Sequence, residues 1–289
     1  MTKEEYYQTV FEAIKEHFGD GYTVTRQTVA KNNGTELEGI TVKHEGSVVA
    51  PTVYPDDPYR KGTDAQEAAR AMIGSIEEAI LEDLGALQFF YDYGEIKKKV
   101  CFRIVSAKRN EELLSRVPHR IIEDLAMIYV VPVDMGKRGQ GTITVLNSHM
   151  DFWEADEDDL HLAAMENTPK LMPAKMMPMD EMVPLAKILG TSSLSIISNE
   201  NFAYGAGVIF YTGLSQKLHK RLGDFYIIPA SVHECILIPG ACSISIDRTE
   251  EIIRIVNQEC VEENEFLSDT LYRYDSDTGT IVPARSWGE

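Results

Sequence analysis

The amino-acid sequence predicts an α+β fold, in which a small N-terminal module of a β-meander plus helix precedes a larger module of helices and a mixed or antiparallel sheet. Two observations indicate this class. Turn residues join three consecutive strand-like runs near the N-terminus, and later in the chain adjacent pairs of strands are divided by single helices, unlike regular βαβ winding. The pattern changes past Tyr93, so we expect the two modules at residues 1–110 and 118–289.

The first module begins with a helix. Thr2 and Glu5 have the spacing of a capping box, apolar residues follow at helical spacing, and Gly19 ends the helix. The apolar positions are Tyr6, Tyr7, Val10, Phe11, Ile14 and Phe18. This pattern predicts an amphipathic helix whose inner face covers the meander.

The meander follows directly. Residues 22–29 and 36–43 flank Asn32-Asn33-Gly34, a hairpin signal, and a further turn leads into a third strand at 48–54. After a proline-rich turn, a long helix is expected from Asp64, with Ala65, Ala68, Ala69, Met72, Ile73, Ile76 and Ile80 as its apolar stripe.

The second module alternates strands and helices. Strands are expected at 100–105, 125–133, 142–146, 194–198, 206–211, 224–229 and 234–239, and helices at 156–167, 214–222 and 247–260. Asp247 and Glu250 have capping spacing for the last helix. Residues 275–289 indicate a short hairpin and a tail.

Acidic side chains dominate the charge. The 289 residues include 46 Asp and Glu against 28 Lys and Arg, so the formal net charge is −18. Such a surface repels phosphate backbones, and direct nucleic-acid binding is therefore not expected. No apolar run reaches the roughly 18 to 20 residues that cross a bilayer, and the first residues lack the order of a signal peptide. We therefore expect a cytoplasmic protein without membrane contact.

The sulfur-containing residues favour structural roles. Four cysteines, Cys101, Cys235, Cys242 and Cys260, are scattered without paired spacing, which in a reducing compartment indicates buried thiols. Five methionines cluster in the segment 172–182, at Met172, Met176, Met177, Met179 and Met182. Flexible thioethers fill irregular core gaps or form adaptable contact surfaces. Core filling ranks first and a surface for a protein partner second.

Common catalytic and cofactor motifs are absent or misplaced. Gly205-Ala206-Gly207 precedes an expected strand, whereas a dinucleotide site needs its glycines between a strand and a helix. The glycine-rich segment 136–141 joins two strands, and 275–279 lacks the glutamate that closes a calcium loop. The chain contains no serine-hydrolase elbow, His-Glu-x-x-His or Cys-x-x-Cys pattern. No cofactor is indicated.

Three polar pairs lie near expected strand ends and have side chains suited to acid–base chemistry or metal binding. The candidate catalytic residues are His149, Asp151, His233 and Glu234, and the candidate substrate-binding residues are His119 and Arg120. Imidazole accepts a proton near neutral pH, and a carboxylate orients it or supplies an oxygen ligand. The same groups can satisfy buried backbone groups where strands end, or, for His119 and Arg120, pair with Glu123 and Asp124 across a helical turn. The structural roles rank first, and a metal is left open.

At these same residues the sequence resembles an uncharacterised bacterial family known only as a domain of unknown function (DUF5688). The matching segments run along nearly the whole chain and are Asn33-Gly34 to Gly39-Ile40, Ala50-Pro51-Thr52-Val53-Tyr54, Asn110 through Leu113-Leu114 to Pro118-His119-Arg120, Asn147-Ser148-His149 with Trp153, Ala164 through Asn167-Thr168-Pro169, and Asp224 to Ile228 leading into Ser231-Val232-His233-Glu234. The resemblance implies an intact bacterial, cytoplasmic protein and brings with it no reaction, cofactor or catalytic residue.

The leading hypothesis is therefore an acidic interaction or regulatory module, in which the methionine-rich segment and the acidic runs 154–159 and 262–265 contact a protein partner. The alternative is a hydrolase or metal-dependent enzyme that uses the His/Asp/Glu residues, with His119 and Arg120 binding an anionic group. Geometry separates the two. Convergence of these side chains in one open pocket favours the enzyme, and dispersal over separate strand ends favours the interaction module.

Overall fold

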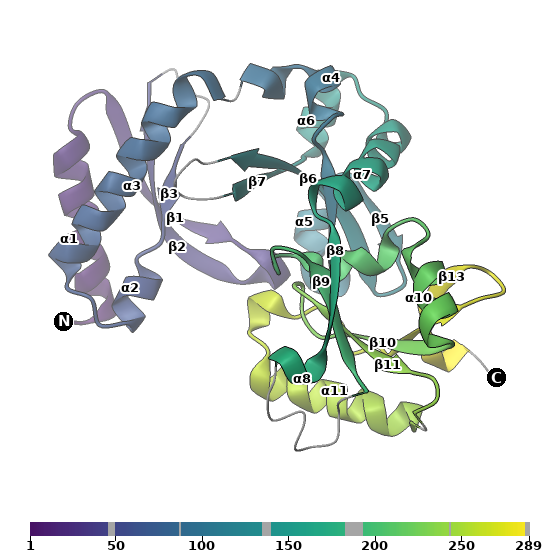
Figure 1. The fold of residues 1–289 in the computed structure, drawn as a ribbon. Coiled ribbons are helices and arrows are strands. Elements are labelled where there is room, and N and C mark those ends of the chain that lie inside the picture. The colour runs from purple at the N-terminus through teal and green to yellow at the C-terminus, as the bar shows by residue number, and fades with distance from the viewer. Residues whose placement is uncertain (46–49, 87, 135–139, 183–192, 243, 287–289) are drawn as a thin grey trace. The chain divides into compact units, whose positions relative to one another are not determined.

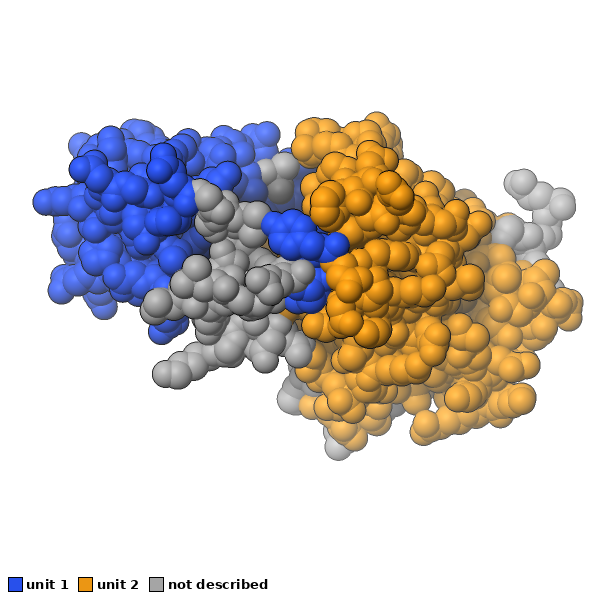
Figure 2. Space-filling view, turned by 90° about the horizontal axis from the view of Figure 1, so that it is seen from above, with its two compact units in different colours: residues 1–91, 135–139 blue, residues 92–134, 140–289 orange. Residues whose placement is uncertain are grey.

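The computed structural model describes residues 1–45, 50–86, 88–134, 140–182, 193–242 and 244–286. It confirms the α+β class, because helices accompany three sheets in which every described strand pair is antiparallel (Figure 1). The chain forms two compact units, Met1–Tyr91 and Asp92–Asp134 with Gln140–Glu289 (Figure 2). Each unit is described by itself below.

The first unit contains the expected helix, meander and long helix. Its elements are α1 (Lys3–Phe18), β1 (Tyr22–Ala30), β2 (Glu36–His44), β3 (Thr52–Val53), α2 (Asp56–Arg60) and α3 (Ala65–Ala86), with 3-10 turns at Asn32–Gly34 and Gln88–Tyr91. The capping box is confirmed, because the Glu5 N–H donates to Thr2 Oγ1 at 3.2 Å and the Thr2 N–H donates to Glu5 Oε2 at 2.8 Å.

The β1–β2 hairpin has the expected turn. Asn33 adopts φ +60°, a left-handed conformation that asparagine tolerates better than most residues, and the strands pair from Tyr22↔His44 to Ala30↔Glu36. The third strand is confirmed over Thr52–Val53, which pairs with β2, while residues 46–49 of the predicted strand lie outside the described residues.

The core of the first unit lies between its two long helices and the sheet. α1 and α3 pack side by side on the meander (Figure 1). The fully buried residues come from α1, β2 and α3, as the apolar stripes predict, and include Val10, Ile14, Ile40, Val42 and Ile76. Burial of these apolar side chains supplies the main driving force for folding of this unit.

The second unit contains the remaining elements. Its helices are α4 (Tyr93–Ile96), α5 (Glu111–Leu114), α6 (Asn147–Trp153), α7 (Glu157–Leu171), α8 (Met179–Met182), α10 (Leu214–Leu222) and α11 (Ile246–Cys260). Its strands are β4 (Cys101–Ser106), β5 (His119–Ile122), β6 (Leu125–Asp134), β7 (Gln140–Thr144), β8 (Ala174–Pro178), β9 (Ser195–Asn199), β10 (Phe225–Pro229), β11 (Cys235–Pro239), β12 (Tyr272–Asp275) and β13 (Thr280–Pro283).

These strands form two sheets. One has six strands in the order β13-β12-β10-β11-β9-β8, and the other is built around the long strand β6. β6 pairs with β4 along one edge, and with β5 and then β7 along the other, because Val130 pairs with both Cys101 and Thr144. Val130, Cys101 and most of β4 are buried.

Two local predictions were wrong. Residues 206–211 were expected to form a strand, but Gly205–Phe210 is a 3-10 helix, buried from Gly205 to Ile209. A Cβ atom on Gly205 would lie 2.2 Å from Ser198 Oγ, so this segment packs too closely against β9 for a side chain there. The cap of α11 is Ser245, whose Oγ accepts the Arg248 N–H, and not the expected Asp247.

The compact units divide between Tyr91 and Asp92, earlier than the expected domain boundary near residues 110–118. The reason is that β4 pairs with β6 over its whole length, which joins residues 101–106 to the second unit. That the two units fold as separate domains stays a proposal.

The four cysteines are free, but only Cys101 and Cys235 are buried, whereas Cys242 is partly exposed and Cys260 is exposed. The expectation of four buried thiols was therefore wrong for two of them. Among the described residues, no helix is both long and apolar enough to cross a membrane.

Candidate functional site

His149 lies at the start of α6 and holds a backbone group. Its Nδ1 accepts the Leu146 N–H at 3.1 Å, so a side chain in the first helical turn satisfies the residue that precedes the helix. Its ring centroid lies 5.5 Å from that of Trp153. Burial lowers the pKa of His149, which favours the neutral imidazole that this hydrogen bond needs. Asp151 lies on the same helix and is exposed.

His233 lies in the turn between β10 and β11 and also binds a main-chain group. Its Nδ1 accepts the Tyr204 N–H at 3.1 Å, and the two rings lie 5.3 Å apart. Its Nε2 is 3.5 Å from Glu265 Oε1. Glu234 accepts a hydrogen bond from Ser231 Oγ at 2.9 Å, and the same hydroxyl accepts the His233 N–H at 3.0 Å. These contacts stabilise the turn.

His119 and Arg120 lie on β5, so the expected pairing with Glu123 and Asp124 across a helical turn was wrong. His119 Nδ1 lies 2.9 Å from the carbonyl oxygen of Val117. Arg120 forms an ion pair with Asp158 in the first turn of α7.

The histidines of these three pairs contact different main-chain groups: the Val117 carbonyl for His119, the Leu146 N–H for His149 and the Tyr204 N–H for His233. Within the described ranges, no three His, Cys, Asp or Glu side chains are grouped so as to hold a metal ion. The structure therefore brings His233 and Glu234 into one turn, but it does not assemble the six candidates into one constellation.

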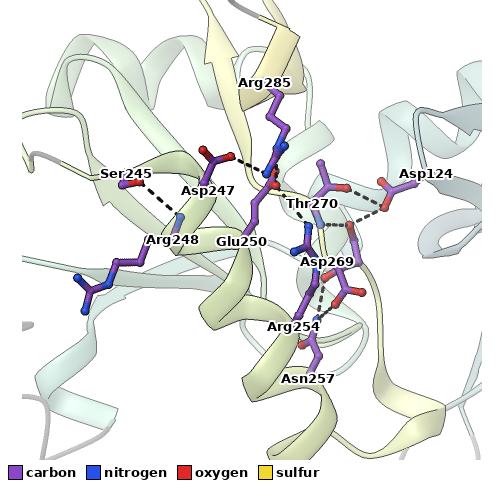
Figure 3. A network of polar contacts seen from close by, with 11 residues as sticks. Asp124, Ser245, Asp247, Arg248, Glu250, Arg254, Asn257, Asp269, Thr270 and Arg285 are labelled. Carbon is purple, nitrogen blue, oxygen red and sulfur yellow. Dashed lines mark hydrogen bonds and ion pairs between the residues drawn. The ribbon is translucent and has the colours of Figure 1, made fainter.

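Asp124 belongs to a separate polar network on the second unit. Its carboxylate accepts hydrogen bonds from Ser268 Oγ at 2.7 Å, Thr270 Oγ1 at 3.1 Å and the Tyr272 hydroxyl. Figure 3 shows this network continuing through Asn257 of α11, which donates to Asp269 at 2.8 Å. Three donors on one partly buried carboxylate indicate a structural anchor for the segment before β12.

A second group of polar contacts surrounds a buried carboxylate of α11. Glu250 accepts a hydrogen bond from Arg285 Nε at 2.5 Å and lies 3.6 Å from Arg254 (Figure 3). Its side chain is only 6% exposed, and Arg285 also pairs with Asp247 at 2.8 Å. Because two arginines compensate the buried charge, this group too is explained by structure.

A cavity that the sequence did not reveal lies within the second unit. It has a volume of about 480 Å³ and is lined by residues of β4, β6 and β7 and by the segment after β9. Phe102, Val130, Pro132 and Met172 form apolar walls, and Thr142, Asn201 and Tyr204 add polar groups. Of the lining residues that the structure describes, Arg103 is the one that carries a charge.

Arg103 has no carboxylate partner among the described residues. Its Nε is shut off from solvent and makes no hydrogen bond, and its Nη2 reaches Thr144 Oγ1 at 3.5 Å, the outer limit of such a bond. The guanidinium carbon lies 4.8 Å from the ring centroid of Tyr204. Burial lowers the pKa of Arg103, since desolvation disfavours the charged form.

The segment that carries Tyr204 is held in an unusual conformation. Phe202 and Tyr204 both have φ +52°, which is rare for aromatic residues. Buried Asn199 fixes the bend, because its Oδ1 accepts the N–H groups of Asn201 and Ala203 and its Nδ2 donates to the Ala203 carbonyl. His233 then holds the Tyr204 N–H. Strained backbone of this kind is found preferentially at functional sites.

The sequence contains one signal that could have indicated this cavity. Arg103 is the single charged residue in an otherwise apolar strand, and a charge within a buried strand needs a compensating group. The remaining lining residues come from segments far apart in the chain, so no spacing pattern connects them.

Comparison with known proteins gives a family but no activity. The model of a family of unknown function, DUF5688, matches residues 3–276. No curated protein and no solved structure matches the chain.

Proposed function

Since the chain belongs to this family of unknown function, which assigns it no activity, we propose from its geometry that it is an acidic interaction or regulatory module rather than an enzyme. One observation carries the proposal: the imidazoles of His149 and His233, the two residues best suited to catalysis, each use Nδ1 to accept a main-chain N–H. A nitrogen occupied in this way is not available as a general base or as a metal ligand.

The surface of the second unit supports a binding role. On α11, Ile252, Ile255 and Val256 are 51%, 54% and 45% exposed, and their spacing places them on one side of the helix. Adjacent exposed apolar side chains mark interaction surfaces more often than isolated ones do. The contact surface for a protein partner thus includes an apolar helix face as well as acidic groups.

The acidic run 154–159 contributes less than its charge suggests. Asp156 caps α7 by accepting the Asp159 N–H at 3.1 Å, Asp158 pairs with Arg120, and Asp159 pairs with Lys97 at 2.6 Å. Half of the run is therefore engaged within the unit. Met176 and Met177 lie on β8, partly buried, which suits both core filling and contact with a partner.

The proposal is tested by replacing the two histidines one at a time. His149→Ala and His233→Ala should each lower the free energy of unfolding by about 1 to 3 kcal/mol, because each leaves a main-chain N–H without its acceptor. The matched control, Asp151→Ala, changes an exposed neighbour on α6 and should stay within about 0.5 kcal/mol of wild type. Thermal denaturation is measured with and without Zn²⁺ or Mn²⁺.

The enzyme alternative predicts the opposite result. If melting of both variants in the absence of metal equals that of wild type, and a metal-induced shift of wild type is lost in them, the histidines are ligands and our proposal is wrong. No metal-induced shift together with destabilised variants supports it.

We also propose that the protein is bacterial and that it is located in the cytoplasm. The four free cysteines support the cytoplasmic location. Protein purified without reductant and then unfolded should give four titratable thiols. A smaller count with an intramolecular disulfide detected by mass would contradict the cytoplasmic address.

A further inference from the structure

The cavity beside Arg103 contains a charge that the described part of the chain does not balance. The guanidinium has one marginal hydrogen bond, to Thr144, and one ring contact, to Tyr204. Its Nε is enclosed and has no partner. A buried ion without a partner is costly, and proteins compensate it with a counter-charge or with ordered hydrogen bonds. Here the space next to the guanidinium is a cavity of about 480 Å³.

We propose that this cavity binds a small organic carboxylate, whose anionic group pairs with Arg103 and whose organic body contacts the apolar walls formed by Phe102, Val130 and Met172. The inference deepens the proposed function and rests on it, because it names what the regulatory module recognises. The residue that binds the ligand, Arg103, is not among the six candidate residues.

The chemistry of the lining favours a carboxylate over a phosphate. A guanidinium presents a planar fork of donors that matches a single carboxylate, whereas a phosphate dianion is bound by several cations or by a series of backbone N–H groups. Among the described residues of the lining, Arg103 is the one cation, and apolar side chains form much of the remainder. The cavity volume lies within the range typical of small-molecule sites.

The bend after β9 forms part of the lining of this site. Tyr204 lies between the His233 ring, 5.3 Å away, and the Arg103 guanidinium, 4.8 Å away. Because His233 fixes the Tyr204 N–H, the imidazole acts as a positioning residue for the ring that covers the guanidinium. This arrangement explains why a strained conformation is retained at Phe202 and Tyr204.

The test is isothermal titration of the full chain with benzoate, hexanoate and succinate at constant ionic strength. At least one carboxylate should bind saturably, and benzamide, which has the shape of benzoate without its charge, should bind at least about tenfold more weakly than benzoate if benzoate is the ligand that binds. Arg103→Met should abolish the preference for the charged ligand. The matched control Arg221→Met removes an exposed arginine at the end of α10 and should bind as wild type does.

The melting temperature of Arg103→Met without ligand is a second readout. A purely structural role for Arg103 predicts a lower melting temperature for this variant, and a ligand-binding role does not. Without ligand, Arg103→Met should melt at or above the wild-type temperature, because the substitution removes a buried charge that lacks a counter-charge and keeps an apolar stem. If this variant does not fold, Thr142→Phe replaces it. Thr142 lines the cavity and is exposed. The phenyl ring of Thr142→Phe should block access of the ligand and leave the Arg103 guanidinium unchanged.

The outcomes are distinct. No saturable binding of any of the three carboxylates, or binding that neither Arg103→Met nor Thr142→Phe weakens, overturns the inference. Binding of inorganic phosphate in place of the carboxylates overturns the ligand class. A peptide with a free C-terminal carboxylate could also bind more tightly than its amidated form while no small carboxylate binds. The ligand would then be the C-terminus of a protein, and this result also overturns the inference.

Failure of the proposed function looks different. If a bound carboxylate is recovered chemically changed, as followed by NMR, the site stands but the chain is an enzyme. If the histidine variants behave as structural residues and no carboxylate binds, the interaction module stands and the inference falls.

Discussion

Several polar side chains of this chain bind main-chain groups. His149 and His233 accept backbone N–H groups, and Asn199 satisfies three backbone groups of one bend. Such contacts consume the lone pairs and donors that catalysis would need. Arg103 differs, because its Nε has no hydrogen-bond partner and its guanidinium pairs with no carboxylate among the described residues. The type of a residue therefore does not by itself indicate a functional site. What indicates one is whether the polar atoms of its side chain already have hydrogen-bond partners.

His149 should make stability depend on pH. Its folded-state pKa is lowered below the ordinary value of 6.5, so the unfolded chain binds the proton more readily than the folded one. The contribution of His149 is therefore complete above about pH 6.5 and is lost as the pH falls from there toward the lower folded-state pKa.

His149→Gln tests this directly. The amide oxygen can accept the same Leu146 N–H but does not titrate, so the variant should resemble wild type at about pH 8 and lose less free energy of unfolding on the way to about pH 5. Urea unfolding at several pH values gives the two slopes, and equal slopes would contradict the neutral, buried imidazole.

The buried Glu250 makes Arg285 a structural residue. Arg285→Met should lower the free energy of unfolding by about 1 to 3 kcal/mol. Among the described residues, Glu250, whose side chain is 6% exposed, would then keep only Arg254, at 3.6 Å, as a partner of its carboxylate. The double variant Arg285→Met/Glu250→Met should be less destabilised than the sum of the single changes, as urea denaturation would measure. Strict additivity would show that the pair is not coupled.

At the scale of elements, α11 shows how one helix serves two environments. Glu250, Ile253 and Asn257 are its buried residues and recur at helical spacing. Ile253 packs with Leu271 and Ala284 in a small cluster. Ile255, two positions further on, faces the other way and is 54% exposed. Two isoleucines of the same helix therefore contribute differently to the stability of the fold.

This contrast gives a matched pair of variants. Ile253→Ala should cost about 2 to 5 kcal/mol, because the side chain is 4% exposed and its removal leaves a cavity. Ile255→Ala should change the free energy of unfolding by no more than about 0.5 kcal/mol. Chemical denaturation of both variants decides the point, and comparable losses would mean that the Ile255 face is covered in solution.

The chain forms two compact units, and the hydrophobic clusters of the described residues named here each lie within one unit. The cluster around Val10 and Ile76 lies entirely in residues 1–91, and the clusters around Ile128 and Ile253 lie entirely in the second unit. Separate cores are the physical basis of independent folding. We accordingly propose that the two parts unfold as separate domains.

The distribution of tryptophan makes this testable without cutting the chain. The two tryptophans of the sequence are Trp153 and Trp287, so residues 1–91 contain none, and the fluorescence of the buried Trp153 monitors the second unit. Far-UV circular dichroism monitors helices and strands of both. If the units unfold independently, the two probes should give transitions at different urea concentrations. Coincident transitions at every pH tested would show a single cooperative unit.

The sequence by itself determined the elements whose signals are local. The capping box of Thr2 and Glu5 located α1, Asn33 located the first hairpin, and helical spacing located α7, α10 and α11 to within a few residues. These signals are local because a helix or a hairpin turn is specified by residues at most a few positions apart. The α+β class followed from the order of such elements.

Tertiary structure decided the remainder. The strand pattern at 206–211 was overridden because Gly205 packs against Ser198 and His233, and the role of His233 depends on Tyr204. The cavity exists only because β4, β6, β7 and the bend after β9 meet around Arg103. Contacts between residues so far apart in the chain have no fixed spacing, and the free energy of burying a charge depends on every neighbour. For that reason the sequence alone did not indicate this site.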